Sequence, residues 1–158
     1  SENYSVVTID DQDSSYVGGF AGKYDDPSGN GEISNCYTRS TLSVTGSYIG
    51  GFAGSLQKQA SLSNCYVVTA TTVTFAGSAD QSVSDSNICL FSSTNFVNTA
   101  WGAIRTDDQM KDYSTFTSLN WSISETPDPS KTWGIDSTKV INNGYPYLQY
   151  FGASTVTP

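Results

Sequence analysis

The sequence predicts an all-β fold, a parallel β-solenoid of about three coils, with a C-terminal cap that contains one short helix and a terminal β-hairpin. Two repeated segments carry this prediction. Residues 48–54 (YIGGFAG) repeat residues 16–22 (YVGGFAG), and residues 64–66 (NCY) repeat residues 35–37. The copies lie about 30 residues apart, a period typical of stacked-repeat folds. Apolar and polar residues alternate within these segments, as they do in half-buried strands.

A third, weaker copy of the repeat follows the first two. Residues 73–77 (VTFAG) keep the phenylalanine but lack the double glycine, and residues 87–90 (NICL) place Ile88 between the asparagine and the cysteine. At the other end, Asn3 precedes the first copy by the same interval as Asn35 precedes the second. We therefore expect the chain to open inside an earlier repeat and to be part of a longer chain.

Each repeat is expected to form about three short strands of β-branched and aromatic residues, joined by polar corners. Such strands cannot bury an apolar face alone, but a neighbouring repeat covers their inward side chains and pairs their edges. The expected strands are residues 5–9, 16–22, 33–37, 42–46 and 48–54.

The repeated residues are interpreted as structural positions. The glycine pairs fit places where a backbone bends or another backbone comes close. The phenylalanines would stack in an inward ladder, and Asn35, Asn64 and Asn87 would hydrogen-bond from one repeat to the next. The structural positions are Gly18, Gly19, Phe20, Gly22, Cys36, Gly50, Gly51, Phe52, Gly54, Cys65, Phe75 and Cys89.

The last third of the chain differs from the repeats, so residues 1–104 are assigned to the repeats and residues 105–150 to a capping segment of the same domain. Residues 106–109 (TDDQ) have the form of a capping box, which predicts a single helix through about Asp112. The turn 142–144 (NNG) predicts the terminal hairpin. Residues 151–158 are expected to be a tail or linker. The cover for the exposed repeat edge is expected from Trp121, Trp133, Tyr145, Tyr147 and Leu148.

Composition restricts the function. The chain has 158 residues, a net charge of −8 and no histidine. The negative charge disfavours nucleic acid as a partner. The lack of histidine removes Ser-His-Asp and Cys-His catalysis and the commonest transition-metal ligand. No apolar run approaches the roughly 20 residues that cross a bilayer, so direct membrane insertion is not expected.

The three cysteines, Cys36, Cys65 and Cys89, are expected at equivalent corners, and their odd number leaves at least one thiol free. Paired strands bring equivalent Cα atoms within bridging distance, but their parallel Cβ vectors suit a disulfide poorly. A ladder of buried thiols is favoured over a bond between Cys36 and Cys65. A catalytic thiol would need an activating base, and none is evident.

Other motifs were weighed against structural interpretations. Residues 18–23 (GGFAGK) resemble the end of a phosphate loop, but Tyr24 stands where that loop needs Ser or Thr. Acidic clusters at residues 10–13, 25–26, 107–108 and 125–128 lack a calcium-loop spacing, so solvated turns are favoured over calcium or glycosidase sites. No catalytic, cofactor or metal residues are predicted. Packing in the core or at a corner is favoured for four further aromatic residues, which could alternatively stack on sugar rings: Tyr24, Tyr48, Tyr66 and Tyr113.

Taken together, these motifs resemble the GLUG-repeat family of bacterial surface proteins. The resemblance rests on the two glycine-rich cores, the Asn-Cys-Tyr corners, residues 106–110 (TDDQM) and the closing residues 145–148 (YPYL), and it covers residues 4–148. It implies a parallel β-solenoid in large secreted or wall-attached proteins, often adhesin-like, and sometimes in the non-catalytic region of surface peptidases. The family's repeat supplies no catalytic residue.

We therefore expect a non-catalytic structural or adhesive module of a secreted or cell-surface bacterial protein, which mediates or presents attachment to a host or extracellular surface. Its partner would be a host or extracellular-matrix protein or a surface glycan. The alternatives are a carbohydrate-binding or polysaccharide-processing domain, and an accessory domain of a cell-surface peptidase.

Overall fold

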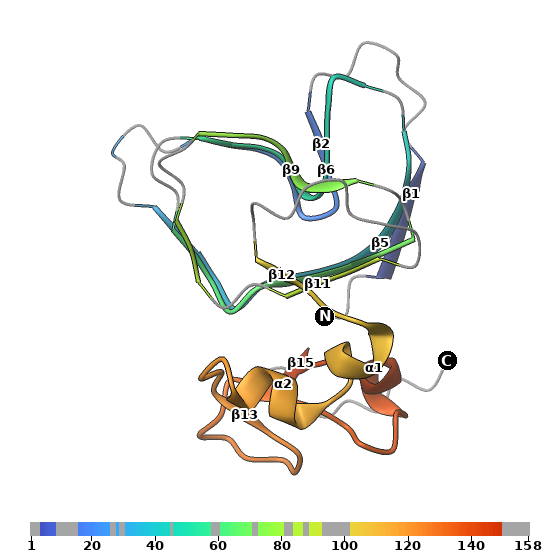
Figure 1. Ribbon diagram of the computed structural model, residues 1–158, viewed down its shortest axis with the longest axis vertical. Helices are drawn as coiled ribbons and strands as arrows, with labels where there is room; N and C mark the ends of the chain where they lie inside the picture. The colour runs from blue at the N-terminus through green and yellow to red at the C-terminus, as the bar shows by residue number, and fades with distance from the viewer. Residues whose placement is uncertain are drawn as a thin grey trace. The chain divides into compact units, whose positions relative to one another are not determined.

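The computed structural model describes residues 4–8, 16–25, 28, 31–44, 46–57, 61–70, 73–80, 84–86, 89–92 and 102–149. The chain divides into two compact units, one from Asn3 to Ile104 and the other containing Arg105 to Pro158. We call them the repeat unit and the C-terminal unit (Figure 1). Each is described separately.

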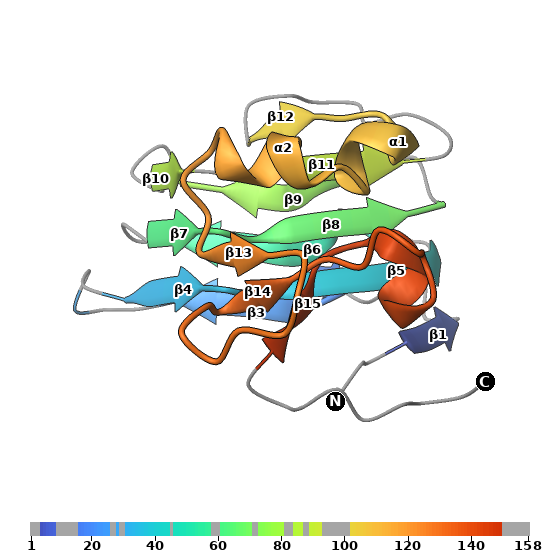
Figure 2. The same ribbon diagram turned by 90° about the horizontal axis from the view of Figure 1, so that it is seen from below.

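The repeat unit contains three sheets in which every described pairing is parallel. One sheet has the strand order β1-β5-β8-β11-β12, and a second has the order β4-β7-β10. In the third sheet β6 pairs with β2 and β3 on one side and with β9 on the other. Figure 2 shows the strands of successive repeats in layers. The strands are β1 (Tyr4–Thr8), β2 (Tyr16–Gly18), β3 (Ala21–Asp25), β4 (Glu32–Ser34), β5 (Tyr37–Ser43), β6 (Tyr48–Gln57), β7 (Ser61–Ser63), β8 (Tyr66–Thr69), β9 (Thr74–Ala79), β10 (Ser84–Ser86), β11 (Cys89–Ser92) and β12 (Ala103–Ile104).

The core of the repeat unit is built by the same positions in successive repeats. Along β5 every second residue is buried, and Leu42 lies on the buried side. Phe52 and Phe75 are fully buried, and their rings stack with centroids 4.9 Å apart. Phe20 stacks on Phe52 at 4.7 Å. The predicted phenylalanine stack is therefore confirmed, although Phe20, at its end, is 48% exposed.

Glycine allows neighbouring repeats to approach closely. A Cβ atom on Gly18 would lie 2.5 Å from the Cα of Ala53, and one on Gly50 would lie 2.8 Å from the Cα of Ala76. No side chain fits at such distances from a backbone atom, so only glycine satisfies the spacing between strands. The predicted close approach of backbones is confirmed at both positions.

The glycine-rich core of the third repeat is one residue shorter than that of the second, and a β-bulge absorbs the difference. Gly50 pairs with Thr74 and Ala53 pairs with Ala76, so β6 advances by one residue more than β9 between these pairs. This is where the third copy lacks the second glycine. The stack of Phe52 on Phe75 is retained across the bulge.

Two register predictions are corrected. Cys89 pairs with Tyr66 rather than with Cys65, because the extra residue Ile88 moves the cysteine one position along the strand. Likewise Tyr4 pairs with Arg39, whereas the interval between Asn3 and Asn35 predicts a partner three residues earlier. Asn3 itself and Asn87 lie outside the described residues.

The Asn-Cys-Tyr corners use the left-handed backbone region. Asn35 and Asn64 have φ of 53° and 50°, a conformation that asparagine tolerates better than most residues. After each corner a tyrosine begins a strand, and the rings of Tyr37 and Tyr66 stack at 5.0 Å. The side-chain oxygen of Asn64 is buried and has no hydrogen-bond partner among the described residues, so the predicted asparagine ladder is not formed by this oxygen.

The C-terminal unit has its own core and a small mixed sheet. β13 (Ile123–Ser124) pairs in parallel with β14 (Trp133–Gly134), which pairs antiparallel with β15 (Tyr147–Leu148). The helices are α1 (Asp107–Met110), α2 (Tyr113–Thr117) and the 3-10 helix η1 (Ile141–Gly144). Thr106 forms the predicted capping box with Gln109. Buried residues of this unit include Met110, Phe116, Trp121, Ile123, Trp133, Ile135 and Tyr145.

The predicted fold class is wrong. In place of an all-β solenoid with a one-helix cap, the described strands form four small separate sheets, and the C-terminal unit is a distinct compact unit with two α-helices. The second helix was missed because its start signal is a lone Asp112, whose side chain accepts the N–H of Ser114.

The terminal hairpin is also absent from the described residues. The turn residues Asn142 and Asn143 do have positive φ, as a tight hairpin turn requires. However, Asp136 accepts the backbone N–H groups of Val140 and Ile141, which removes them from strand pairing.

Candidate functional site

The best candidate for a contact surface is a pair of exposed tyrosines in the repeat unit. Tyr16 begins β2 and Tyr48 begins β6, and the two residues pair in register. Their rings stack with centroids 5.2 Å apart and planes 11° apart. Tyr16 is 37% exposed and Tyr48 is 40% exposed. We call these two residues the tyrosine pair.

The alternation of the strand places the tyrosine pair outside. Val17, the next residue after Tyr16, is buried, so the two side chains point to opposite faces. In β6 Tyr48 is exposed at the start of the strand, Ile49 is half-buried, and the residues from Gly50 to Leu56 are all buried. Each ring covers one face of the other, and the rest of the two side chains is partly exposed to solvent.

A charged pair lies beside the tyrosines. The Nζ of Lys23 is 5.7 Å from the ring centroid of Tyr16, within cation–π range, and 3.5 Å from a carboxylate oxygen of Asp25. Both charged side chains are more than a third exposed, so this ion pair contributes little to stability. The ion pair places one positively and one negatively charged hydrogen-bonding group next to an aromatic surface.

The predicted contact aromatics separate into different environments. Of these residues, Tyr48 is exposed. Tyr66 is fully buried in β8, so its predicted role in ligand contact is wrong. Tyr24 is half-buried and packs against the core, and Tyr113 is half-buried at the start of α2. Tyr16 was missed, although it occupies the same repeat position as Tyr48 and could have been found from that equivalence.

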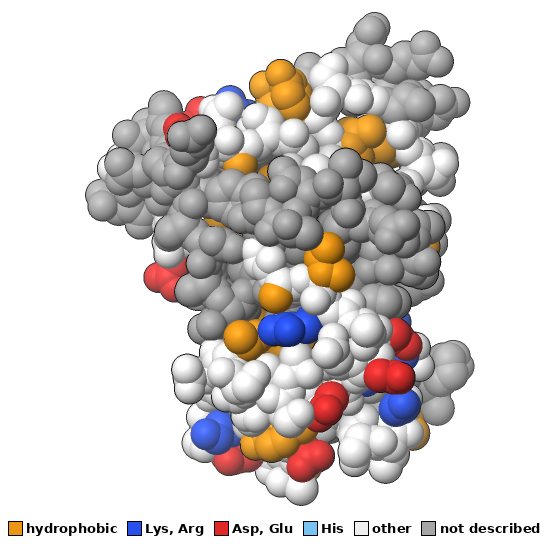
Figure 3. Space-filling view, viewed as in Figure 1, with side chains coloured by type: hydrophobic (Ala, Val, Ile, Leu, Met, Phe, Trp, Pro, Cys, Tyr) orange, Lys and Arg blue, Asp and Glu red, His pale blue; other side chains and the backbone are white. Residues whose placement is uncertain are grey.

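The face seen in Figure 3 shows only small apolar areas, because the hydrophobic side chains of the described residues form separate patches there rather than one continuous area. Among the described residues, the large hydrophobic residues that are exposed are Tyr16, Phe20, Tyr48, Ile104 and Val140.

The cysteine thiols are structural. Cys36 and Cys65 are both free, and each donates a hydrogen bond of 3.2 Å to a carbonyl two residues before it. The hydrogen bond between the two thiols and burial raise the pKa of Cys65, whereas the same hydrogen bond lowers the pKa of Cys36. A thiol held protonated, as at Cys65, is a poor nucleophile. The favoured interpretation of free thiols is confirmed for these two cysteines.

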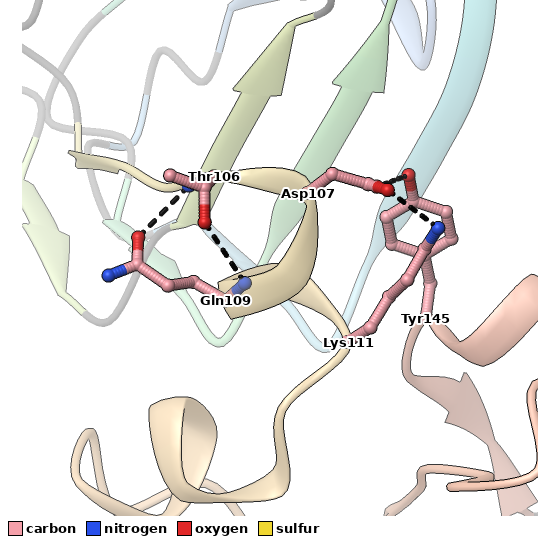
Figure 4. A network of polar contacts seen from close by, with 5 residues as sticks. All are labelled: Thr106, Asp107, Gln109, Lys111 and Tyr145. Carbon is pink, nitrogen blue, oxygen red and sulfur yellow. Dashed lines mark hydrogen bonds and ion pairs between the residues drawn. The ribbon is translucent and has the colours of Figure 1, made fainter.

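The acidic residues at 107–108 serve a local structural role. Lys111 Nζ donates to Asp107 at 2.8 Å, and the Tyr145 hydroxyl donates to the other carboxylate oxygen (Figure 4). Burial alone would raise the pKa of Asp107, but these two hydrogen bonds outweigh it and lower the pKa. The ammonium of Lys111 also lies 4.7 Å from the ring centroid of Tyr145. This network ties α1 to the segment after η1.

The remaining predicted acidic sites give no metal centre in the described part of the chain, where no group of three or more potential ligands is found. Residues 10–13 and Asp26 lie outside that part. Glu125 is exposed, and Asp128 closes a turn by accepting hydrogen bonds from Ser130. None of the described helices is long and apolar enough to cross a membrane.

Comparison of the chain with protein-family models, with curated proteins and with solved structures gives no match. The resemblance to GLUG-repeat proteins therefore stays a prediction, and the tyrosine pair is the site from which a function has to be argued.

Proposed function

We propose that this chain is a non-catalytic structural and adhesive module of a secreted or cell-surface protein, and that the tyrosine pair is part of its contact surface. The observation that carries the proposal is the run of stacked rings. Rings from successive repeats lie 4.7 to 5.2 Å apart, deep in the core for Phe52 and Phe75 and exposed for Tyr16 and Tyr48. A stiff framework with exposed aromatic groups favours attachment to a partner over enzymatic turnover.

Rigidity follows from the way the repeats are joined. Parallel pairing fixes each strand along its length, and the glycine contacts leave no room for strands to slide. A rigid aromatic surface loses little conformational entropy when it binds, because tyrosine has only two side-chain torsions to order. Tyrosine is also among the residues most enriched at binding hot spots.

The chemistry of the described side chains supports the same proposal. The two described thiols are held by carbonyl groups, and Asp107 is neutralised by Lys111. These groups are engaged in holding the fold, so they do not support a nucleophile or an acid–base pair.

Adhesion of the immobilised chain to extracellular-matrix proteins and to cells would test the proposal. We expect saturable adhesion that the double variant Tyr16→Ala/Tyr48→Ala reduces at least about tenfold in apparent affinity. Val140→Ala is the control, since it shortens an exposed apolar side chain of the C-terminal unit and should leave adhesion unchanged. Equal adhesion by the double variant and the parent chain would refute the role of the tyrosine pair.

A second candidate function is carbohydrate binding, favoured by the tyrosine hydroxyls beside Lys23 and Asp25. Sugars are recognised by hydrogen bonds to such groups and by contact with aromatic rings. A glycan array separates the two candidates. Binding to defined glycans that is lost in Tyr16→Ala/Tyr48→Ala would support carbohydrate binding, whereas adhesion to proteins with a blank array would support the structural and adhesive module.

A further inference from the structure

One edge of the sheet that contains the tyrosine pair has no strand on it among the described residues. The central strand β6 is covered on both sides, by β2 and β3 on one and by β9 on the other. In contrast, β2 and β3 pair only with β6 in the part of the chain that is described. An edge with unpaired backbone groups is a template for a further strand.

The glycines show what kind of strand fits on that edge. A Cβ atom on Gly54 would lie 2.4 Å from the backbone nitrogen of Val17, in the preceding repeat, and one on Gly77 would lie 2.5 Å from that of Ile49. Because these two glycines have no side chain, each leaves room for the backbone of the tyrosine and the following hydrophobic residue of the preceding repeat. Gly22 occupies the same position in the first repeat, but among the described residues a Cβ atom there would meet only the Tyr16 carbonyl oxygen, at 3.2 Å. We call this unfilled space the Gly22 recess.

The phenylalanine stack is also open at this edge. Phe52 has a ring on either side, from Phe20 and Phe75, and is fully buried. Among the described residues Phe20 stacks only on Phe52, and it is 48% exposed. A further aromatic ring at the usual spacing would bury the open face of Phe20.

A third contact restricts the sequence of the incoming strand. Within the repeats, Gly18 lies against Ala53 and Gly50 lies against Ala76, too close for any side chain. The corresponding alanine of the first repeat is Ala21, which pairs with Ala53. A strand that adds to this edge in the same way needs a glycine opposite Ala21, between its hydrophobic residue and its phenylalanine.

From these three contacts we propose that the β2–β3 edge binds an extended segment of the tyrosine–hydrophobe–Gly-Gly-Phe type, added in parallel. Its tyrosine–hydrophobe backbone fills the Gly22 recess, its first glycine lies on Ala21, and its phenylalanine stacks on Phe20. The interface continues the one that already joins the repeats.

The probe for this proposal is a synthetic peptide with the sequence of residues 46–57 (GSYIGGFAGSLQ). We expect saturable binding to the chain in a fluorescence anisotropy titration, together with slower amide hydrogen exchange in β2 and β3. Two peptide variants test the contacts separately, one with Gly50→Val and one with Phe52→Ser. Each should bind at least about tenfold more weakly than the parent peptide.

Variants of the chain test the acceptor side. Gly22→Val fills the recess and should weaken peptide binding at least about tenfold. Thr41→Val is its control, because it also introduces a valine, but at an exposed position of β5, a strand with partners on both sides. Should Gly22→Val prove unfolded by circular dichroism, the two peptide variants still decide the question with the parent chain.

The outcomes are distinct. Binding of the parent peptide that both peptide variants lose supports the proposal, and so does concentration-dependent self-association of the chain that Gly22→Val abolishes, since a second copy would then supply the strand. No peptide binding with no self-association would overturn it. Binding that all peptides share, or protection outside β2 and β3, would overturn it as well.

Discussion

The two units of this chain are held together in different ways. In the repeat unit the contacts between repeats are made by glycine, alanine and stacked phenylalanine, and they recur at equivalent positions. The C-terminal unit has no repeats. It is held together by hydrogen bonds of individual polar groups such as Asp107 and Asp136, and by a cluster of aromatic rings in which Trp121 contacts Phe116 and Trp133. The stability of the repeat unit therefore depends on close packing between equivalent positions, whereas the stability of the C-terminal unit depends on particular hydrogen bonds.

The largest effect is expected from the centre of the phenylalanine stack. Phe52→Ala removes a fully buried ring with neighbours on both faces and should lower the free energy of unfolding by about 3 to 5 kcal/mol. Phe20→Ala, at the open end, should cost only about 1 kcal/mol. Denaturant titration followed by circular dichroism measures both, and equal losses would show that the stack does not end at Phe20.

A matched pair of glycines tests the close contacts between backbones. Gly54→Ala forces a methyl group against the β2 backbone and should cost about 2 to 4 kcal/mol. Gly22→Ala makes the same chemical change where only one carbonyl oxygen is near, and its effect should stay within about 1 kcal/mol. The difference between their denaturation midpoints is the measured quantity. A Gly22→Ala variant as unstable as Gly54→Ala would mean that the Gly22 recess is already filled.

In the C-terminal unit the corresponding test is Asp136. Its carboxylate accepts hydrogen bonds from Thr138, Val140 and Ile141, and Asp136→Ala should destabilise this unit by about 1 to 2 kcal/mol. In a Trp101→Phe background, tryptophan fluorescence reports on this unit through Trp121 and Trp133. A variant with an unchanged fluorescence transition would contradict the role given to these hydrogen bonds.

The same residue predicts a pH dependence. Hydrogen bonds from the Thr138 hydroxyl and the Ile141 N–H lower the pKa of Asp136 from its ordinary 3.8 to about 2. Because the pKa is lower in the folded state, the stabilisation is complete above about pH 4 and is lost as the pH falls from about 4 to about 2. In acid titrations monitored by fluorescence, Asp136→Asn should remove this part of the pH dependence. An acid transition that keeps its steepness in the variant would assign it to other carboxylates.

The smallest effect is expected at the start of α1. Thr106→Ala removes the N-cap bond to the N–H of Gln109 and should cost about 1 kcal/mol, whereas Thr106→Ser keeps the hydroxyl and should cost less. Thermal unfolding followed by tryptophan fluorescence can resolve such a difference. Identical melting temperatures for the two variants would mean that the capping box contributes nothing measurable.

Repetition also decided how much could be predicted from the sequence. The stack of Phe20, Phe52 and Phe75, the close glycine contacts and the capping box at Thr106 were each signalled by spacing alone. Cys89 and the terminal hairpin were misplaced because a single residue decided each outcome, Ile88 in one case and Asp136 in the other. The predicted fold class failed because the spacing of a repeat indicates which strands pair, but not that they form several small separate sheets, nor how a separate C-terminal unit folds.

The candidate site was predicted only in part. Tyr48 was identified, but Tyr66 was placed on the surface because the sequence shows an aromatic residue without showing which strands surround it. Its full burial follows from the position of β8 between β5 and β11. Exposure of an aromatic side chain thus depends on pairing partners distant in sequence.

The bulge between β6 and β9 has a consequence for how such chains change over evolutionary time. The third copy has one residue fewer than the second at the glycine pair, yet the strands on either side of this point are aligned and the rings are in contact. Insertions and deletions at this point are therefore buffered locally instead of shifting every later side chain to the wrong face. Repeats of unequal length can follow one another in one molecule, so divergence in length need not break the structure.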